Sequence, residues 1–184
     1  MSEIPGRVFL DSSTLQTLQT YGEFIYDGGE IPQGDRIWSI LDGFENVDSL
    51  QQIVIIWGRG TFQLALSKNS LREVNDRGRY SYLQWALEML DYCEGCLAEY
   101  CDGVSPFTGR GQDLAVKIAK GNFGYLSEKD AMLIKDAVLL ECEVFLTMEK
   151  KLPKNAPHIE RELGIRILQP KDYWDILKLW ASLF

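Results

Sequence analysis

The sequence contains little histidine, no long apolar run and no excess of positive charge, and each shortage excludes a class of protein. His158 is the single histidine in 184 residues, so neither a Cys/His zinc tetrad nor a histidine-based nucleophilic triad is expected. No apolar run approaches the roughly 20 residues that a membrane-spanning helix requires. The formal net charge of −8 argues against the broad basic surface that grips nucleic acid nonspecifically.

The first residues, MSEIPGR, lack the charged and apolar regions of a secretory signal. A cytoplasmic protein without a membrane partner is therefore expected. A length of 184 residues, with 46% hydrophobic and 25% charged residues, is typical of one globular domain with a substantial core. No internal repeat or interdomain linker divides the chain, and the turn-rich stretches at 26–35 and 101–112 are interpreted as loops within the domain.

The four cysteines are expected to be free thiols, because disulfides are rare in intracellular proteins. The segment CEGCLAEYC contains a CxxC pair, which a metal or redox site would also use. Apolar residues surround this pair at helical spacing. Cys93 and Cys96 therefore fall on or beside the buried face of a helix over residues 80–100, where small thiols pack well. Core packing is the favoured interpretation.

Short apolar runs predict four strands, at residues 7–10, 62–66, 143–146 and 165–168. Apolar residues at helical spacing predict helices between and after them, around residues 50–57, 80–100, 114–118, 131–139 and 170–180. Strands that are separated by helices need crossover connections, which produce parallel pairing with helices on both faces of the sheet. The predicted fold class is α/β, a three-layer α/β/α sandwich with a short, mainly parallel central sheet.

Acidic residues recur where this sheet would bind a ligand. In open parallel sheets, ligands bind outside the carboxyl ends of the strands. Asp11 and Glu149 follow the first and third strands, and Glu73 lies near the start of the helix after the second strand. Asp130 lies in the first turn of the helix that precedes the third strand. That helix runs antiparallel to the strand, so its first turn reaches the same edge. The four acids are therefore predicted to meet.

Each acid also has an ordinary structural interpretation. These interpretations are a helix N-cap for Asp11, capping boxes for the pairs Ser70–Glu73 and Ser127–Asp130, and a solvated surface charge for Glu149. Together, however, the acids would repel one another, by roughly 3 kcal/mol for two carboxylates about 5 Å apart at an effective dielectric of about 20. A hard divalent cation relieves this repulsion. The predicted cofactor is therefore Mg²⁺ or Mn²⁺, both of which prefer oxygen ligands.

Four segments resemble the PIN-domain nucleases, a family that includes the toxin ribonucleases of prokaryotic toxin–antitoxin modules. They are RVFLDSSTL, LALSKNSLREV, SEKDAMLIKDAVLLECEVFLTMEKKL and GIRILQPKDYWDILKLW, in this order along the chain. The resemblance covers most of residues 1–184 as a single PIN-like domain. Residues 22–50 and 101–125 look like embellishments of the family pattern.

The resemblance implies a metal-dependent endoribonuclease that cleaves single-stranded RNA. The four acids that hold the cation in the family match Asp11, Glu73, Asp130 and Glu149 as both catalytic and metal-binding residues. Small hydroxyl residues beside the first acid and after the third strand match Ser12 and Thr147 as supporting residues. Asp136, six residues beyond Asp130, is the alternative third acid. Toxin-like members form homodimers and are held by an antitoxin protein. The resemblance therefore implies two partners to be tested for this chain, a second copy of itself and an antitoxin.

We hypothesise hydrolysis by a metal-activated water, with no covalent enzyme intermediate. Asp11 and Asp130 would be the main ligands, Glu73 a further ligand or the base that orients the water, and Glu149 would complete the site or support a second ion. The competing hypothesis is a catalytically degenerate PIN-like module that holds a partner or RNA without cutting it. A haloacid-dehalogenase-like phosphatase is disfavoured, because it needs the pattern DxD where this chain has Asp11-Ser12-Ser13.

Overall fold

The computed structural model describes residues 5–59, 62–67, 69–70, 84–89, 91, 93, 118 and 126–181. Its four strands are β1 (Arg7–Leu10), β2 (Gln63–Ala65), β3 (Val144–Leu146) and β4 (Arg166–Leu168). They form one sheet in the order β2-β1-β3-β4, and every neighbouring pair is parallel. The four predicted strands are confirmed, with bounds that differ by one residue or less at each end.

Helices connect the strands in the described part of the chain. Between β1 and β2 lie α1 (Ser12–Thr20), α2 (Gly22–Asp27), the 3₁₀ helix η1 (Arg36–Ser39) and α3 (Gly43–Trp57). The helix α7 (Glu128–Leu139) precedes β3, η2 (Leu152–Asn155) and α8 (Ala156–Leu163) precede β4, and α9 (Pro170–Leu177) follows it. Residues 84–89, 91 and 93 are helical, as predicted for that stretch. Most of the helix predicted around residues 114–118 lies outside the described residues.

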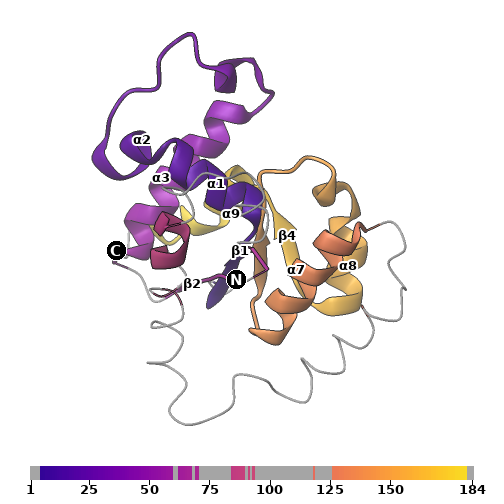
Figure 1. Cartoon of the computed structure of the whole chain (residues 1–184). Helices are drawn as coiled ribbons and strands as arrows, with labels where there is room; N and C mark the ends of the chain where they lie inside the picture. Colours follow the sequence, from indigo (N-terminus) through magenta and orange to yellow (C-terminus); the bar gives the residue numbers. More distant parts are fainter. Residues whose placement is uncertain are drawn as a thin grey trace.

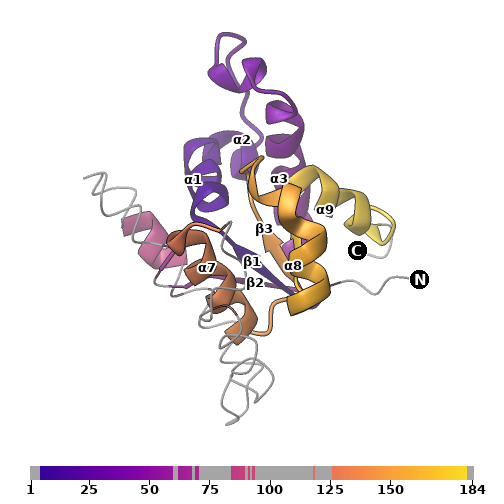
Figure 2. The same cartoon turned by 90° about the vertical axis from the view of Figure 1, so that its right-hand side faces the viewer.

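Side chains of the strands alternate between two separate cores, because successive residues of a strand point to opposite faces. Val8, Leu10 and Leu146 pack with apolar residues of α1, α3 and α9 on one face. Phe9 and Phe145 face the other way and pack with residues of α7 and α8. Their rings stack with centroids 5.4 Å apart. Figures 1 and 2 show these two sets of helices on opposite sides of the sheet. The α/β class with a parallel sheet is confirmed, and the layers are compatible with the predicted sandwich.

The chain leaves β1 and β3 in opposite directions. The connection after β1 begins with α1, which packs on one face, whereas the connection after β3 leads to α8 on the other face. The boundary between the carboxyl ends of β1 and β3 is therefore the topological switch point of the sheet, where parallel α/β folds bind ligands. Asp11 and Thr147 are the first residues beyond these two strand ends.

Residues 28–42 form an excursion between α2 and α3 that projects beyond the rest of the described chain (Figure 2). It belongs to the stretch that looks like an embellishment in the sequence. Asn46 Oδ1 accepts a hydrogen bond from the Lys171 amide at 3.1 Å, so the start of α3 lies beside the start of α9. Because α9 begins just after β4 ends, the excursion lies on the same side of the molecule as the carboxyl ends of the strands.

Contacts from several elements fix the shape of this excursion. Asp35 accepts hydrogen bonds from the Ile37 amide and from the Tyr21 hydroxyl, both at 2.8 Å. Asp42 pairs with Lys171 of α9 at 2.6 Å. A side chain at Gly43 would place its Cβ 2.5 Å from the Ile37 carbonyl oxygen, so only glycine allows this close approach. Among the described helices, none has the length and apolar character that crossing a bilayer requires.

Candidate functional site

Asp11 lies at the carboxyl end of β1 and is the N-cap of α1. Its amide donates to the Leu146 carbonyl at 3.1 Å, which extends the pairing of β1 with β3 by one residue. Its Oδ1 accepts a hydrogen bond from the Thr14 amide at 2.7 Å, as expected of an aspartate that caps a helix. The residue is only 5% exposed. The capping interpretation of Asp11 is thus confirmed, but burial sets it apart from an ordinary surface cap.

Two hydroxyl groups also donate to the Asp11 carboxylate. The Thr147 hydroxyl donates to Oδ2 at 2.5 Å from the first position after β3. The Ser13 hydroxyl lies 2.8 and 2.9 Å from the two carboxylate oxygens. These hydroxyls in turn accept hydrogen bonds from the amides of Glu149 and Met148, each at 3.0 Å. The loop after β3 is therefore fastened to the start of α1 through the Asp11 side chain.

Burial raises the pKa of Asp11 above its ordinary value, although the hydrogen bonds from Thr147, Thr14 and Ser13 act in the opposite direction. The free-energy cost of removing the charged carboxylate from water thus exceeds the stabilisation that these hydrogen bonds give to it. A cation beside Asp11 would favour the charged form and lower its pKa. The carboxylate and hydroxyl oxygens at this point are the type of ligand that Mg²⁺ and Mn²⁺ prefer.

The resemblance implied Ser12 as the hydroxyl residue that supports Asp11. In the structure the hydroxyl that contacts the Asp11 carboxylate belongs to the next residue, Ser13. Thr147 lies where the resemblance placed it, fully buried and bonded to Asp11. The contacts of Ser13 and Thr14 were missed in the sequence, although the order Asp-Ser-Ser-Thr at the start of a helix is a signal for them. An N-cap aspartate accepts from donors two or three residues further along.

The other predicted acids are placed differently. Asp130 lies in the first turn of α7, where its amide donates to the Ser127 hydroxyl at 3.1 Å and its carboxylate accepts from the same hydroxyl at 2.8 Å. Ser127 is thus confirmed as the N-cap of α7. Glu149 is exposed, and its amide holds Thr147. Glu73 lies outside the described residues.

Asp136, the alternative third acid, is tied to the loop after β2. The side-chain amide of Asn69 donates to its carboxylate at 2.7 Å. One residue beyond Asn69, the buried Ser70 hydroxyl donates to the Leu10 carbonyl at 3.4 Å, which brings this loop against the end of β1. Asn69 and Ser70 therefore link Asp136 to the residue that precedes Asp11. Neither contact was foreseen in the sequence.

Within the residues that the structure describes, no three side chains of aspartate, glutamate, histidine or cysteine lie close enough together to hold a metal ion. Asp11, Asp130, Asp136 and Glu149 thus do not form such a group by themselves. Glu73 falls on undescribed residues, so a metal site that includes Glu73 stays a prediction.

The chain was also compared with known proteins. No family model, curated protein or solved structure matches it. The resemblance to PIN-domain nucleases therefore rests on the sequence segments quoted above. What the geometry adds is one buried aspartate at the switch point of a parallel sheet, supported by hydroxyl groups from α1 and from the loop after β3.

The described cysteines are packed in the interior. Cys93 is fully buried in the core formed on the α1 side of the sheet. Cys142 is buried on the α7 side, where burial raises the pKa of its thiol. Both are free thiols. Core packing is confirmed for Cys93, whereas Cys96 lies outside the described residues.

Proposed function

We propose that the protein is a metal-dependent endoribonuclease of the PIN type, which hydrolyses phosphodiester bonds of single-stranded RNA at the Asp11 edge of the sheet. The observation that carries the proposal is the burial of Asp11 at the switch point between β1 and β3, with Thr147 donating to it. A purely structural N-cap would be equally well satisfied at the surface. Burial of an acid costs stability, and such costs are concentrated at functional sites.

In this proposal, Asp11 is the central ligand of Mg²⁺ or Mn²⁺, with Glu73 and with Asp130 or Asp136 as further ligands. Bound there, the ion would activate a water for attack and offset the charge that develops on the phosphate. Ser13 and Thr147 are positioning residues, because they hold the Asp11 carboxylate in one orientation. Glu149 follows Thr147 directly, at the rim of the site, where it would complete the metal site or support a second ion.

The proposal is tested with purified protein, end-labelled single-stranded RNA and Mn²⁺. We expect cleavage by the wild type and loss of cleavage in a chelator. Asp11→Asn should reduce the rate by more than about 100-fold, because a metal ligand contributes more than the roughly 10- to 100-fold that is typical of the groups supporting it. Glu160→Gln, which neutralises an exposed acid on α8, is the matched control and should cleave like the wild type. Equal rates for Asp11→Asn and the wild type would contradict the proposal.

A second candidate function is a degenerate PIN-like module that binds a partner or RNA without cutting it. It is favoured by the hydrogen bonds of Asp11, whose carboxylate already accepts from Thr14, Ser13 and Thr147. An ionised carboxylate has about four acceptor sites, so these donors occupy most of them. Thermal unfolding in Mn²⁺ separates the two candidates. Only a nuclease with an intact site should be stabilised by the ion in a manner that depends on Asp11.

A further inference from the structure

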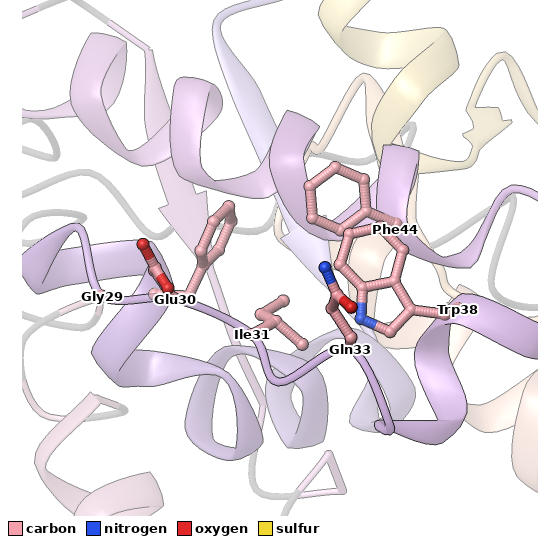
Figure 3. Close-up of a pocket in the computed structure, with 7 residues that line it drawn as sticks. Gly29, Glu30, Ile31, Gln33, Trp38 and Phe44 are labelled. Atoms are coloured by element: carbon pink, nitrogen blue, oxygen red, sulfur yellow. The ribbon is translucent and has the colours of Figure 1, made fainter.

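A pocket of about 600 Å³ lies in the excursion, apart from the Asp11 site. We call it the aromatic pocket, and its lining consists of Phe24, Gly29, Glu30, Ile31, Gln33, Trp38 and Phe44. Figure 3 shows Trp38 and Phe44 at one side of it, Glu30 at the other, and Ile31 and Gln33 between them. Its wall thus combines aromatic faces with a single carboxylate.

The aromatic side of the pocket is held in place before any ligand arrives. The Trp38 ring stacks on Phe44 with centroids 4.2 Å apart and planes 17° from parallel. The Trp38 indole N–H donates to the Pro32 carbonyl at 2.9 Å. The Phe24 ring tilts against Phe44 with centroids 6.0 Å apart. Trp38 is nevertheless 46% exposed. With its N–H already bonded and one face covered, the indole offers a ligand its remaining π surface rather than a hydrogen-bond donor.

Charge decides which ligand suits such a surface. Residues 22–45 contain six acids (Glu23, Asp27, Glu30, Asp35, Asp42 and Glu45) and one base, Arg36. The phosphates of a nucleic acid would be repelled by this excess of negative charge, whereas a cation would be attracted to it. The face of an aromatic ring also attracts cations, and tryptophan does so most strongly. The rings and the acids therefore favour the same class of ligand.

The surroundings of the pocket indicate that the cation belongs to a protein. Three more large apolar side chains of this region are exposed to solvent, namely Tyr26 at 43%, Ile40 at 43% and Leu41 at 73%. A free metal ion or small amine would leave these side chains uncovered. A peptide segment with both basic and apolar residues would cover them, and tryptophan and arginine are enriched among the residues that dominate protein interfaces.

We propose that the aromatic pocket binds an arginine or lysine side chain of a basic peptide segment in a partner protein, with the cationic group over the Trp38 ring and attracted by the negative charge of Glu30 and the other acids of residues 22–45. An arginine suits the pocket especially well, because its planar guanidinium stacks on aromatic rings. The proposal concerns a surface separate from the Asp11 site. It stands whether or not the protein cleaves RNA.

The test measures the binding of fluorescein-labelled hexa-arginine to the full chain by fluorescence anisotropy at about 0.15 M salt, where exposed charges more than a Debye length apart are largely screened. Hexaglutamate and a six-nucleotide single-stranded RNA are the comparison probes. Hexa-arginine should bind the wild type with one-to-one stoichiometry. Trp38→Ala should weaken binding about 10-fold and Glu30→Gln about 3-fold, as expected for a cation–π contact and for the loss of one nearby negative charge. Glu160→Gln, far from the pocket on α8, should change it by less than about 2-fold.

Three outcomes would overturn the proposal. The first is equal binding of hexa-arginine by Trp38→Ala, Glu30→Gln and the wild type. The second is RNA binding that depends on Trp38 while hexa-arginine binding does not, which would make the pocket a base-stacking site. The third is a dimer, seen by sedimentation, that Trp38→Ala abolishes, which would assign the pocket to a second copy of the chain. Should Trp38→Ala fail to fold, Glu30→Gln and Trp38→Phe decide the question, and Trp38→Phe should bind more weakly than the wild type.

Discussion

The Asp11 site and the aromatic pocket lie on the same side of the molecule and are built in opposite ways. At the first, a carboxylate has been removed from water and is surrounded by donors from α1 and from the loop after β3. At the second, a large aromatic ring remains in water although the same chain buries other rings completely. Each arrangement costs stability relative to the ordinary alternative. A buried acid and an exposed ring thus each mark a candidate site, because each departs from the usual distribution of residues between core and surface.

Among the substitutions at the two sites, the largest loss of stability is expected from Thr147→Val, which removes the hydroxyl donor beside Asp11 and keeps the shape of the side chain. Thr147 is fully buried and its hydroxyl bonds to two groups. The change therefore leaves the Asp11 carboxylate without one donor and the Glu149 amide without its acceptor. We expect the free energy of unfolding to fall by about 1–3 kcal/mol. RNA cleavage should fall by about 10- to 100-fold, as for other groups that support a metal ligand. Denaturant unfolding and the cleavage assay measure the two effects, and unchanged values in both would remove Thr147 from the site.

When a chelator removes divalent ions, Asp11→Asn should be more stable than the wild type, and the size of this difference should depend on pH. The pKa of Asp11 is raised in the folded state, so the folded protein holds this proton more tightly than the unfolded chain does. As the pH rises from below the ordinary value of 3.8, the unfolded chain ionises first, and the wild type loses stability relative to the variant. Above the folded-state pKa this difference becomes constant.

Thermal unfolding between pH 4 and pH 8 measures this difference, with about 2–4 °C expected for each kcal/mol in a chain of this length. The advantage of Asp11→Asn should be small at pH 4 and largest at neutral pH. Mn²⁺ should reduce it, because the ion stabilises the charged carboxylate of the wild type alone. An advantage that stays the same across this pH range would show that burial of the charge is not its cause.

A smaller effect should separate the two serines after Asp11. The Ser13 hydroxyl bonds to the Asp11 carboxylate and accepts from the Met148 amide, so Ser13→Ala should cost about 1 kcal/mol. Ser12→Ala should cost less than Ser13→Ala, because the hydroxyl bonded to the Asp11 carboxylate is that of Ser13. Denaturant midpoints of the two variants make this comparison directly. A larger loss for Ser12→Ala would restore that residue to the supporting role that the resemblance implied.

A small effect on stability is expected from Trp38→Ala. Truncation of a buried aromatic residue costs about 3–5 kcal/mol, whereas Trp38 is 46% exposed and rests mainly on Phe44. We expect a loss of about 1 kcal/mol or less, with hexa-arginine binding reduced as described above. A loss as large as that of Phe145→Ala, measured in parallel, would mean that Trp38 belongs to the core and that its ring is not held for a ligand.

The two sites differ in how far the sequence could predict them. The run Val8-Phe9-Leu10 predicted a buried strand, and the rule that ligands bind at carboxyl ends of parallel strands made Asp11 a candidate. Thr147 followed from the family resemblance. The link between Asp136 and Asn69 could not be foreseen, because it depends on how α7 is placed against the loop after β2.

The aromatic pocket was beyond prediction for a related reason. The sequence showed only turn-forming residues around 26–35, which are interpreted as a loop. The shape of the excursion depends on contacts between distant residues, such as the pair of Asp42 with Lys171 and the approach of Gly43 to Ile37. Hydrophobic periodicity carries no information about contacts of this kind, since it reports only which face of an element is buried.

The central claim is that Asp11 binds a divalent cation. The most direct measurement is the binding of Mn²⁺ by electron paramagnetic resonance, in which the signal of the free ion falls as the protein takes it up. We expect that wild type and Glu160→Gln bind Mn²⁺ equally and that Asp11→Asn binds it more than about 100-fold more weakly. Equal Mn²⁺ binding by Asp11→Asn and the wild type, or no binding by the wild type, would contradict it.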